Sequence, residues 1–190
     1  MELVNISYDF SGFDISNICN ILQNSKSDYD IKKKSLEQLT LLLFDCQNKR
    51  GKALFGEDQY LVTDVFTFCL DEILTAFKTT KTYLGENTSE LPLAQVAFLD
   101  QCCKFLFYAY TFYADEPVVK QFFGKLKTFQ SAQSNVQQLE KFETLINSLV
   151  FFTGNQIIRL HALRLLYLIV FNPFWLKVKV TKCPMHQSKT

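Results

Sequence analysis

Residues 34–45, KSLEQLTLLLFD, align without a gap on residues 161–172, HALRLLYLIVFN, at the opposite end of the chain. Seven of the aligned pairs match in kind. They are Leu36/Leu163, Leu39/Leu166, Leu41/Leu168, Leu42/Ile169, Leu43/Val170, Phe44/Phe171 and Asp45/Asn172. The offset from Leu36 to Leu163 is 127 residues, about three periods of roughly 42 residues, which is a spacing of two- and three-helix repeats. The alignment therefore predicts a stack of repeated helices, and such stacks mostly bind other proteins.

The composition indicates one folded domain. Of 190 residues, 48% are hydrophobic and 21% are charged, which allows a continuous core. The 19 Phe and 8 Tyr suit the wide gaps between packed helices. The net charge of +1 provides no overall basic surface of the kind that nucleic-acid-binding proteins usually carry.

The N-terminal residues, MELVN, are acidic and polar, so we expect no signal peptide. The longest uncharged apolar stretches, residues 105–114 and 165–175, fall short of the roughly 20 residues that a membrane-spanning helix needs. We therefore expect an intracellular protein, cytoplasmic or nuclear, without a transmembrane segment.

The cysteines show no C-x-x-C pair. Five of the six fall in or beside predicted helices, where we expect them to be small core residues in a reducing compartment. They are Cys19, Cys46, Cys69, Cys102 and Cys103. Cys183 and His186 form the one local Cys/His pair, too few ligands for a metal site. We expect neither a metal nor a cofactor.

Apolar residues at helical spacing predict about seven helices between residues 14 and 172. The first helix begins at a cap, Asp14, and ends at about residue 22. The other six cover residues 29–47, 57–77, 92–114, 117 to about 129, about 134 to 153, and 156–171. One further helical turn is expected at residues 52–55. Residues 1–13 are expected to be a flexible lead-in, and the threonine-rich residues 78–91 a long loop. The tail, residues 173–190, lacks a helical period; residues 176–180 alternate apolar and basic, and we expect an extended tail rather than a strand.

Three patterns identify the predicted core. In the first helix, Ile15, Ile18, Cys19 and Leu22 face inward, and in the second Ile31, Leu36, Leu39, Leu42 and Leu43 do so. The helix over 92–114 is nearly apolar all round from Phe105 onward, so it should be central and buried.

Gly154 is expected to end the sixth of the seven predicted helices, and Asn155 to cap the seventh.

Residues 36–74 resemble one armadillo repeat: a leucine-rich helix, a polar turn at 45–49, a short connection and a long apolar helix from Leu61. Residues 156–172 resemble the final helix of such a repeat. Leu99 or Cys103 could each be aligned on Leu36, and residues 56–59, GEDQ, replace the small Gly-Ala step usual before the long helix. The resemblance covers about half of the chain and implies an all-α, right-handed armadillo- or HEAT-like solenoid; an irregular helical bundle is the alternative. It also implies a scaffold whose groove holds a peptide or a helix.

The segment Phe174-Trp175-Leu176 follows the entry to what resembles another repeat. Because solenoids need terminal caps, either these residues fold back over the last helix or the chain is a shortened form of a longer solenoid. We favour folding back, since the exposed triplet would be an adhesive patch.

These patterns predict a non-enzymatic scaffold or adaptor that binds another protein, whose identity the sequence does not give. The expected contact residues are charged or aromatic residues that the core pattern leaves unexplained. They are Lys49, Arg50, Lys52, Tyr60, Arg159, Arg164, Phe174 and Trp175.

The sequence bears on two other classes of function, an enzyme and a nucleic-acid-binding protein. No phosphate-binding loop, nucleotide fingerprint, G-x-S-x-G or H-E-x-x-H motif is present, and His161 is expected to be an ordinary helix residue, so we expect no catalytic residue. The alternative function is nucleic-acid binding along a helical groove through Lys32–Lys34 and Lys49–Lys52, with bases stacked on aromatic rings.

Overall fold

The computed structural model describes residues 14–44, 59–83, 91–128 and 136–171, which form seven helices and no strand. The helices are α1 (Ile15–Gln23), α2 (Tyr29–Phe44), α4 (Gln59–Tyr83), α5 (Leu93–Tyr113), α6 (Pro117–Thr128), α7 (Val136–Phe152) and α8 (Arg159–Phe171). The all-α prediction is confirmed for this part of the chain. The predicted lead-in at 1–13, the turn at 52–55 and the tail at 173–190 lie outside the described residues.

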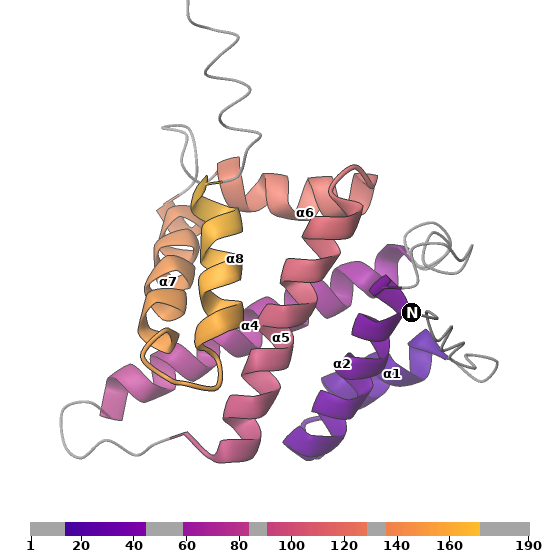
Figure 1. The fold of residues 1–190 in the computed structure, drawn as a ribbon, viewed down its shortest axis with the longest axis horizontal. Coiled ribbons are helices and arrows are strands. Elements are labelled where there is room, and N and C mark those ends of the chain that lie inside the picture. Colours follow the sequence, from indigo (N-terminus) through magenta and orange to yellow (C-terminus); the bar gives the residue numbers. More distant parts are fainter. Residues whose placement is uncertain (1–13, 45–58, 84–90, 129–135, 172–190) are drawn as a thin grey trace, which may run out of the picture.

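The helices form two packed rows (Figure 1). In the first row, α5 lies between α2 and α8 and packs against both. In the second row, α4 contacts α1 and α7. Each helix of the first row also packs on the helix that precedes it in the second, giving the pairs α1/α2, α4/α5 and α7/α8. The short helix α6 contacts α4, α5 and α8.

This order changes the predicted repeat length. The two similar segments lie in α2 and α8, and α5 lies between these two helices in the first row. The offset of 127 residues from Leu36 to Leu163 therefore spans two steps along the row and not three periods of about 42 residues. Leu99 lies almost midway between them, which favours aligning Leu99, rather than Cys103, on Leu36.

Helix α1 follows its sequence pattern closely. The Asp14 carboxylate accepts hydrogen bonds from the backbone N–H groups of Ser16 and Asn17, at 2.9 and 3.2 Å, as an N-cap should. The four residues predicted to face inward are all buried; they are Ile15, Ile18, Cys19 and Leu22. The Cys19 thiol lies 3.8 Å from the backbone oxygen of Leu61, which joins α1 to α4.

Helix α2 has a different phase at its start from the one predicted. Ile31 was expected to be buried but is 52% exposed, whereas Lys32 is 6% exposed. Ile31 lies five residues before Leu36, which places it roughly 140° around the helix from the buried side. The Lys32 ammonium lies 5.3 Å from the centre of the Phe68 ring on α4, a cation–π contact that accounts for its position.

Helix α4 continues to Tyr83, so residues 78–83 do not belong to the predicted loop over 78–91. The Thr79 and Thr80 hydroxyls donate to the backbone oxygens of Thr75 and Ala76, one turn earlier, at 2.9 and 2.7 Å. Threonine is compatible with a helix when its hydroxyl bonds back in this way. The threonine-rich composition was therefore a poor guide to the end of this helix.

Helix α5 is central and largely buried, as predicted. Its Tyr113 hydroxyl donates to the backbone oxygen of Leu43 at 3.3 Å, satisfying a carbonyl in the last turn of α2.

Aromatic rings fill the space beside α4. The ring centre of Phe66 lies 5.7 Å from that of Phe105 and 5.1 Å from that of Phe122. This packing accords with the high phenylalanine content.

A short turn joins α7 to α8. Helix α7 ends at Phe152, just before Gly154, in agreement with the predicted stop. The Asn155 side-chain oxygen accepts from the Ile157 backbone N–H at 2.9 Å. Helix α8 begins at Arg159, three residues later than expected, because residues 156–158 form a turn.

Candidate functional site

Two helices of the first row, α2 and α5, share one pattern of burial when Leu36 and Leu99 are placed in register, and Leu163 of α8 is aligned with both. In α2 and α5, six aligned pairs are buried on both helices. They are Ser35/Phe98, Leu36/Leu99, Leu39/Cys102, Thr40/Cys103, Leu42/Phe105 and Leu43/Leu106. In α8, the residues aligned with the first and fifth pairs, Ala162 and Ile169, are buried as well. Helices α2 and α5 therefore use the same core stripe, whereas α8 shares it in part, since its buried Leu165 aligns with exposed Gln38.

Helix α8 departs from the pattern on one side. Leu163, Tyr167 and Val170 are 47%, 60% and 42% exposed, although their counterparts in α2 and α5 are at most 2% exposed. Those counterparts are Leu36 and Leu99, Thr40 and Cys103, and Leu43 and Leu106. Leu160, one turn before Leu163, is also exposed. We call Leu160, Leu163, Tyr167 and Val170 the terminal face.

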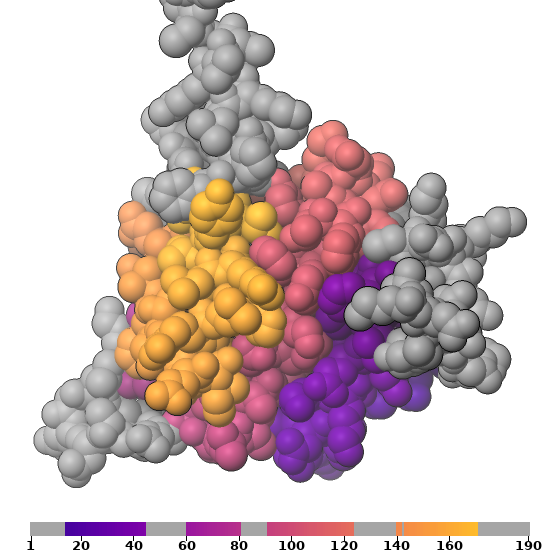
Figure 2. All heavy atoms as spheres, in the orientation of Figure 1, coloured from indigo at the N-terminus to yellow at the C-terminus, as the bar shows by residue number. Residues whose placement is uncertain are grey.

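The contacts of α2 explain what this side of a helix does. Gln101 of α5 donates a hydrogen bond to the Thr40 hydroxyl at 2.7 Å, so the Thr40 side of α2 packs against the next helix of the row. Tyr167 occupies the register of Thr40 on α8, the last described helix of the row. The terminal face therefore corresponds in register to the side of α2 that packs against α5, whereas α5 itself meets α8 through Asp100, Phe107 and Tyr108. Figure 2 shows α8, in yellow, at the surface of the molecule.

The terminal face is a continuous apolar stripe. Its four residues are spaced by three, four and three positions, so they lie on one side of the helix. On α2, the first helix of the row, the exposed stripe with the same spacing consists of Ile31, Lys34, Gln38 and Leu41, and two of these four residues are polar. A contiguous exposed apolar surface on a folded protein marks an interaction site. The two ends of the row therefore differ, and the α8 end is the more apolar.

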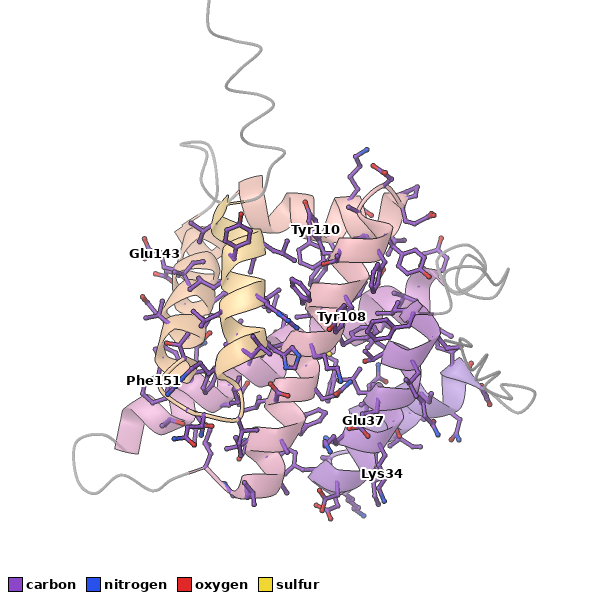
Figure 3. All side chains as sticks on the ribbon, viewed as in Figure 1. Lys34, Glu37, Tyr108, Tyr110, Glu143 and Phe151 are labelled. Carbon is purple, nitrogen blue, oxygen red and sulfur yellow. The ribbon has the colours of Figure 1, made fainter. Side chains whose placement is uncertain are left out.

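The opposite side of α8 is fastened to α5 by polar contacts. His161 Nδ1 lies 2.7 Å from Asp100 Oδ1, and the two side chains are 15% and 20% exposed. Arg164 donates to the Tyr108 hydroxyl at 3.5 Å and lies over the Phe107 ring, 5.6 Å from its centre. Figure 3 shows Tyr108 on α5, between α8 and α2. These contacts hold α8 in place and orient the terminal face outward.

Both arginines predicted as partner contacts make contacts within the chain. Arg164 is engaged with α5 as described, and Arg159 donates to the backbone oxygens of Thr153 and Gly154 at 2.8 and 3.3 Å. Those oxygens follow α7, where a cation is electrostatically favourable. The structure brings Arg159 and Arg164 to one helix but gives each an internal role.

The other predicted contact residues are scattered or lie beyond the described ranges. Tyr60, in the first turn of α4, is 78% exposed. Lys49, Arg50, Lys52, Phe174 and Trp175 are outside the described residues. Tyr60 is on the second row of helices, so nothing in the described part of the chain joins it to Arg159 or Arg164.

The basic cluster proposed for nucleic acid is divided by the helix it lies on. Lys32 is buried over Phe68, and Lys33 pairs with Glu37 at 3.2 Å. Lys34 is exposed. These three lysines therefore do not present a common basic surface.

A polar groove of about 700 Å³ lies between α4 and α7. Its lining includes acidic Asp71, Glu140 and Glu143 together with basic Lys78 and Lys141. The mixed charge favours no one class of ligand. On the described residues, no three His, Cys, Asp or Glu side chains are grouped so as to hold a metal ion.

The residues of the terminal face were missed at the sequence level. The signal was present, because Leu163 and Val170 are two of the seven matched pairs in the repeat. The expected contact residues are charged or aromatic, and Leu163 and Val170 are neither. A matched apolar residue belongs to the core only where a neighbouring helix covers it.

Comparison with protein-family models, with curated proteins and with solved structures gave no match to this chain. Among the helices described, none is both long enough and apolar enough to cross a membrane.

Proposed function

We propose that this protein is a non-enzymatic interaction scaffold, built as a short armadillo- or HEAT-like stack of helical pairs, which binds an amphipathic helix of another protein on the terminal face. The pairs α1/α2, α4/α5 and α7/α8 support a stack, because each row keeps the order of the chain. In such a stack each pair covers the apolar side of the one before it.

One observation carries the proposal. Leu163, Tyr167 and Val170 are exposed, while the residues in the same register of α2 and α5 are buried. A partner helix placed beside α8 as α5 lies beside α2 would repeat the α2/α5 interface. Burying these side chains supplies about 1.5–3 kcal/mol for each large apolar residue that becomes fully covered.

The partner segment should resemble α5 in its chemistry. The side of α5 that meets α2 carries Phe98, Gln101 and Tyr113, two aromatic residues and one amide. We therefore expect a helix with apolar or aromatic residues spaced by three and four, the pattern of helix-in-groove recognition.

The test is affinity capture of the tagged full-length chain, after nuclease treatment, from cells that express it. The test variant is Leu160→Lys/Val170→Lys, which places charge at both ends of the terminal face. The matched control is Ile31→Lys/Leu41→Lys on α2, at the same ten-residue spacing and with similar exposure, 52% and 39% against 53% and 42%. A captured protein must then be purified and bind the wild type and the control, but not the test variant.

Two results would contradict the proposal. Equal loss of the partner in both variants would mean that the contact is not specific to α8. Recovery of material that disappears on nuclease treatment, with no protein bound after it, would favour nucleic-acid binding.

A further inference from the structure

Aromatic rings form a continuous series of contacts across the first row of helices. The centre of the Phe44 ring on α2 lies 4.6 Å from that of Tyr108 and 5.4 Å from that of Phe112, both on α5. Phe44 and Phe112 are 45% and 42% exposed. The Phe107 ring centre lies 5.1 Å from that of Tyr108, and the Arg164 guanidinium of α8 lies 5.6 Å from the centre of Phe107. The series therefore runs from α2 over α5 to a cation on α8.

Lys104 adds a second positive charge beside these rings. It is half-buried and lies one turn after Asp100 and one turn before Tyr108, and both of these residues contact α8. Positions four apart share one side of a helix, so Lys104 is on the side of α5 that faces α8. We call the resulting surface the aromatic–basic surface; it consists of Phe44, Lys104, Phe107, Tyr108, Phe112 and Arg164.

The two cations of this surface form no ion pair with any carboxylate among the described residues. The nearby Asp100 carboxylate is engaged with His161 at 2.7 Å. Arg164 donates one N–H to the Tyr108 hydroxyl, whereas a guanidinium has five N–H donors in a plane that suits a carboxylate. Because the guanidinium also rests on the Phe107 ring, binding an anion requires little further ordering of its side chain.

We propose that the aromatic–basic surface binds a short extended segment of another protein that carries an acidic side chain close to an aromatic or aliphatic one. The carboxylate meets Arg164 and Lys104, and the apolar side chain packs on Phe44 and Phe112. An extended chain advances about 3.3 Å per residue, so the two side chains belong to residues about three or four positions apart. The surface is separate from the terminal face, and the inference does not depend on the function proposed above.

The charges favour such a peptide over a strand of nucleic acid. Asp100 borders the surface next to Lys104, and Glu37 lies seven residues, or two turns, before Phe44 on the same side of α2. A strand with a phosphate on each nucleotide would bring negative charges close to these carboxylates, and two cations would neutralise few of them. A peptide with one or two acidic residues places its charge only where the cations lie.

The probe is an immobilised library of random peptides of about eight residues, screened with the tagged full-length chain. Peptides that bind are then synthesised with a fluorescent label, together with counterparts in which glutamine replaces glutamate and asparagine replaces aspartate. Fluorescence anisotropy at low and high salt gives their dissociation constants. The amide counterparts test the role of charge on the wild-type protein itself, so this comparison does not depend on any variant.

The test variants are Lys104→Glu and Phe112→Ser, and the matched controls are Lys34→Glu and Tyr60→Ser. Lys34 lies ten residues before Phe44, about 15 Å along α2, and Figure 3 shows it well apart from Tyr108 on α5. Tyr60 is 78% exposed on α4. Far-ultraviolet circular dichroism and urea denaturation establish that each variant is folded.

We expect the selected peptides to share an acidic residue about three or four positions from an aromatic or aliphatic one. Lys104→Glu should weaken their binding about fivefold or more, because it replaces an attraction by a repulsion, and added salt should weaken binding by the wild type. The amide counterparts should bind less tightly than the acidic peptides and should not respond to Lys104→Glu. Phe112→Ser should weaken both kinds of peptide, and both controls should bind as the wild type does.

Four results would overturn the inference. One is a library that gives no binding peptide, or peptides without a shared acidic residue. Another is equal loss of binding in Lys104→Glu and Lys34→Glu, which would reflect the net charge alone. Tighter binding of a labelled oligothymidine than of any peptide would assign the surface to nucleic acid. A dimer in sedimentation that Phe112→Ser disrupts would assign it to a second copy of the chain.

The double variant Leu160→Lys/Val170→Lys separates this inference from the proposed function. We expect it to bind the selected peptides as the wild type does. Loss of the peptides in this variant but not in Lys104→Glu would move the peptide site to the terminal face and refute the inference. Retention of the peptides by this variant, with no protein partner captured on the terminal face, would refute the proposed function and leave the inference standing.

Discussion

Gln101 of α5 donates a hydrogen bond to the Thr40 hydroxyl of α2 at 2.7 Å, and the same hydroxyl donates to the backbone oxygen of Leu36 at 2.8 Å. Thr40 and Gln101 are 2% and 3% exposed. The Thr40 oxygen thus acts as acceptor and donor at once, in the middle of the most extensive contact between two helices of the first row. A buried amide is stable in an apolar interface only with such a partner.

Thr40→Val should lower the free energy of unfolding by about 1–3 kcal/mol, because it preserves the shape of the side chain but leaves the Gln101 amide without its acceptor. Urea denaturation followed by circular dichroism measures the change. Thr40→Ser keeps the hydroxyl and should cost less than Thr40→Val. The double variant Thr40→Val/Gln101→Leu should lose less than the sum of the two single changes. Additive losses would show that the hydrogen bond does not contribute.

The elements that the sequence predicted well are those whose burial follows from their own periodicity. Helix α1 has one apolar side and a side-chain cap, so both its start and its inward residues could be found. Helix α5 is apolar nearly all round, which fixes a central position. In these cases the local pattern and the packing agree.

The misjudged positions depend on neighbours that a local pattern does not contain. Lys32, rather than Ile31, is buried because Phe68 of another helix lies beside its ammonium group. Leu163 and Leu36 match in sequence but differ in exposure, 47% against 0%, because α2 is packed between α1 and α5 whereas α8 is the last described helix of its row. The similarity between the two sequence segments identified which residues of α2 and α8 correspond. Whether a corresponding residue is buried depends on which helices lie beside it.

Lys32→Glu should destabilise the protein by about 3–5 kcal/mol, since it places a second negative charge near half-buried Glu72 and removes the cation from Phe68. Lys34→Glu, two positions along on the exposed side, should change stability by no more than about 0.5 kcal/mol. Urea denaturation of both variants provides the comparison. Equal effects would contradict the burial of Lys32. The pair is informative because both residues belong to the basic cluster considered for nucleic-acid binding.

Glu72 predicts a pH dependence of stability. Burial raises the pKa of its carboxyl above the ordinary value of 4.5, the Lys32 charge lowers this pKa, and Asp71 raises it. Between the unfolded and the raised folded value, the folded protein holds a proton that the unfolded chain has released, so stability falls as pH rises through this window. Relative to Glu72→Gln, the wild type should therefore lose stability from about pH 4 upward and then level off.

Two neighbours should change that profile in opposite directions. Lys32→Met removes the charge that lowers the Glu72 pKa and should widen the pH window, whereas Asp71→Asn should narrow it. Urea denaturation at intervals between pH 4 and pH 8 follows all four proteins. A wild type that gains stability with rising pH, relative to Glu72→Gln, would refute the assigned direction.

The buried thiols should be chemically inert in the folded protein. Cys19, Cys69, Cys102 and Cys103 are all buried, and burial raises the pKa of the Cys102 and Cys103 thiols. Thiolate is the reactive form, so both a raised pKa and exclusion of the reagent slow alkylation. With Cys46 and Cys183 replaced by Ser, native iodoacetamide labelling should be at least about 100-fold slower than in urea, or about 2.7 kcal/mol of opening free energy. Mass spectrometry assigns each site, and rapid native labelling of Cys102 would contradict its place in the core between α4 and α5.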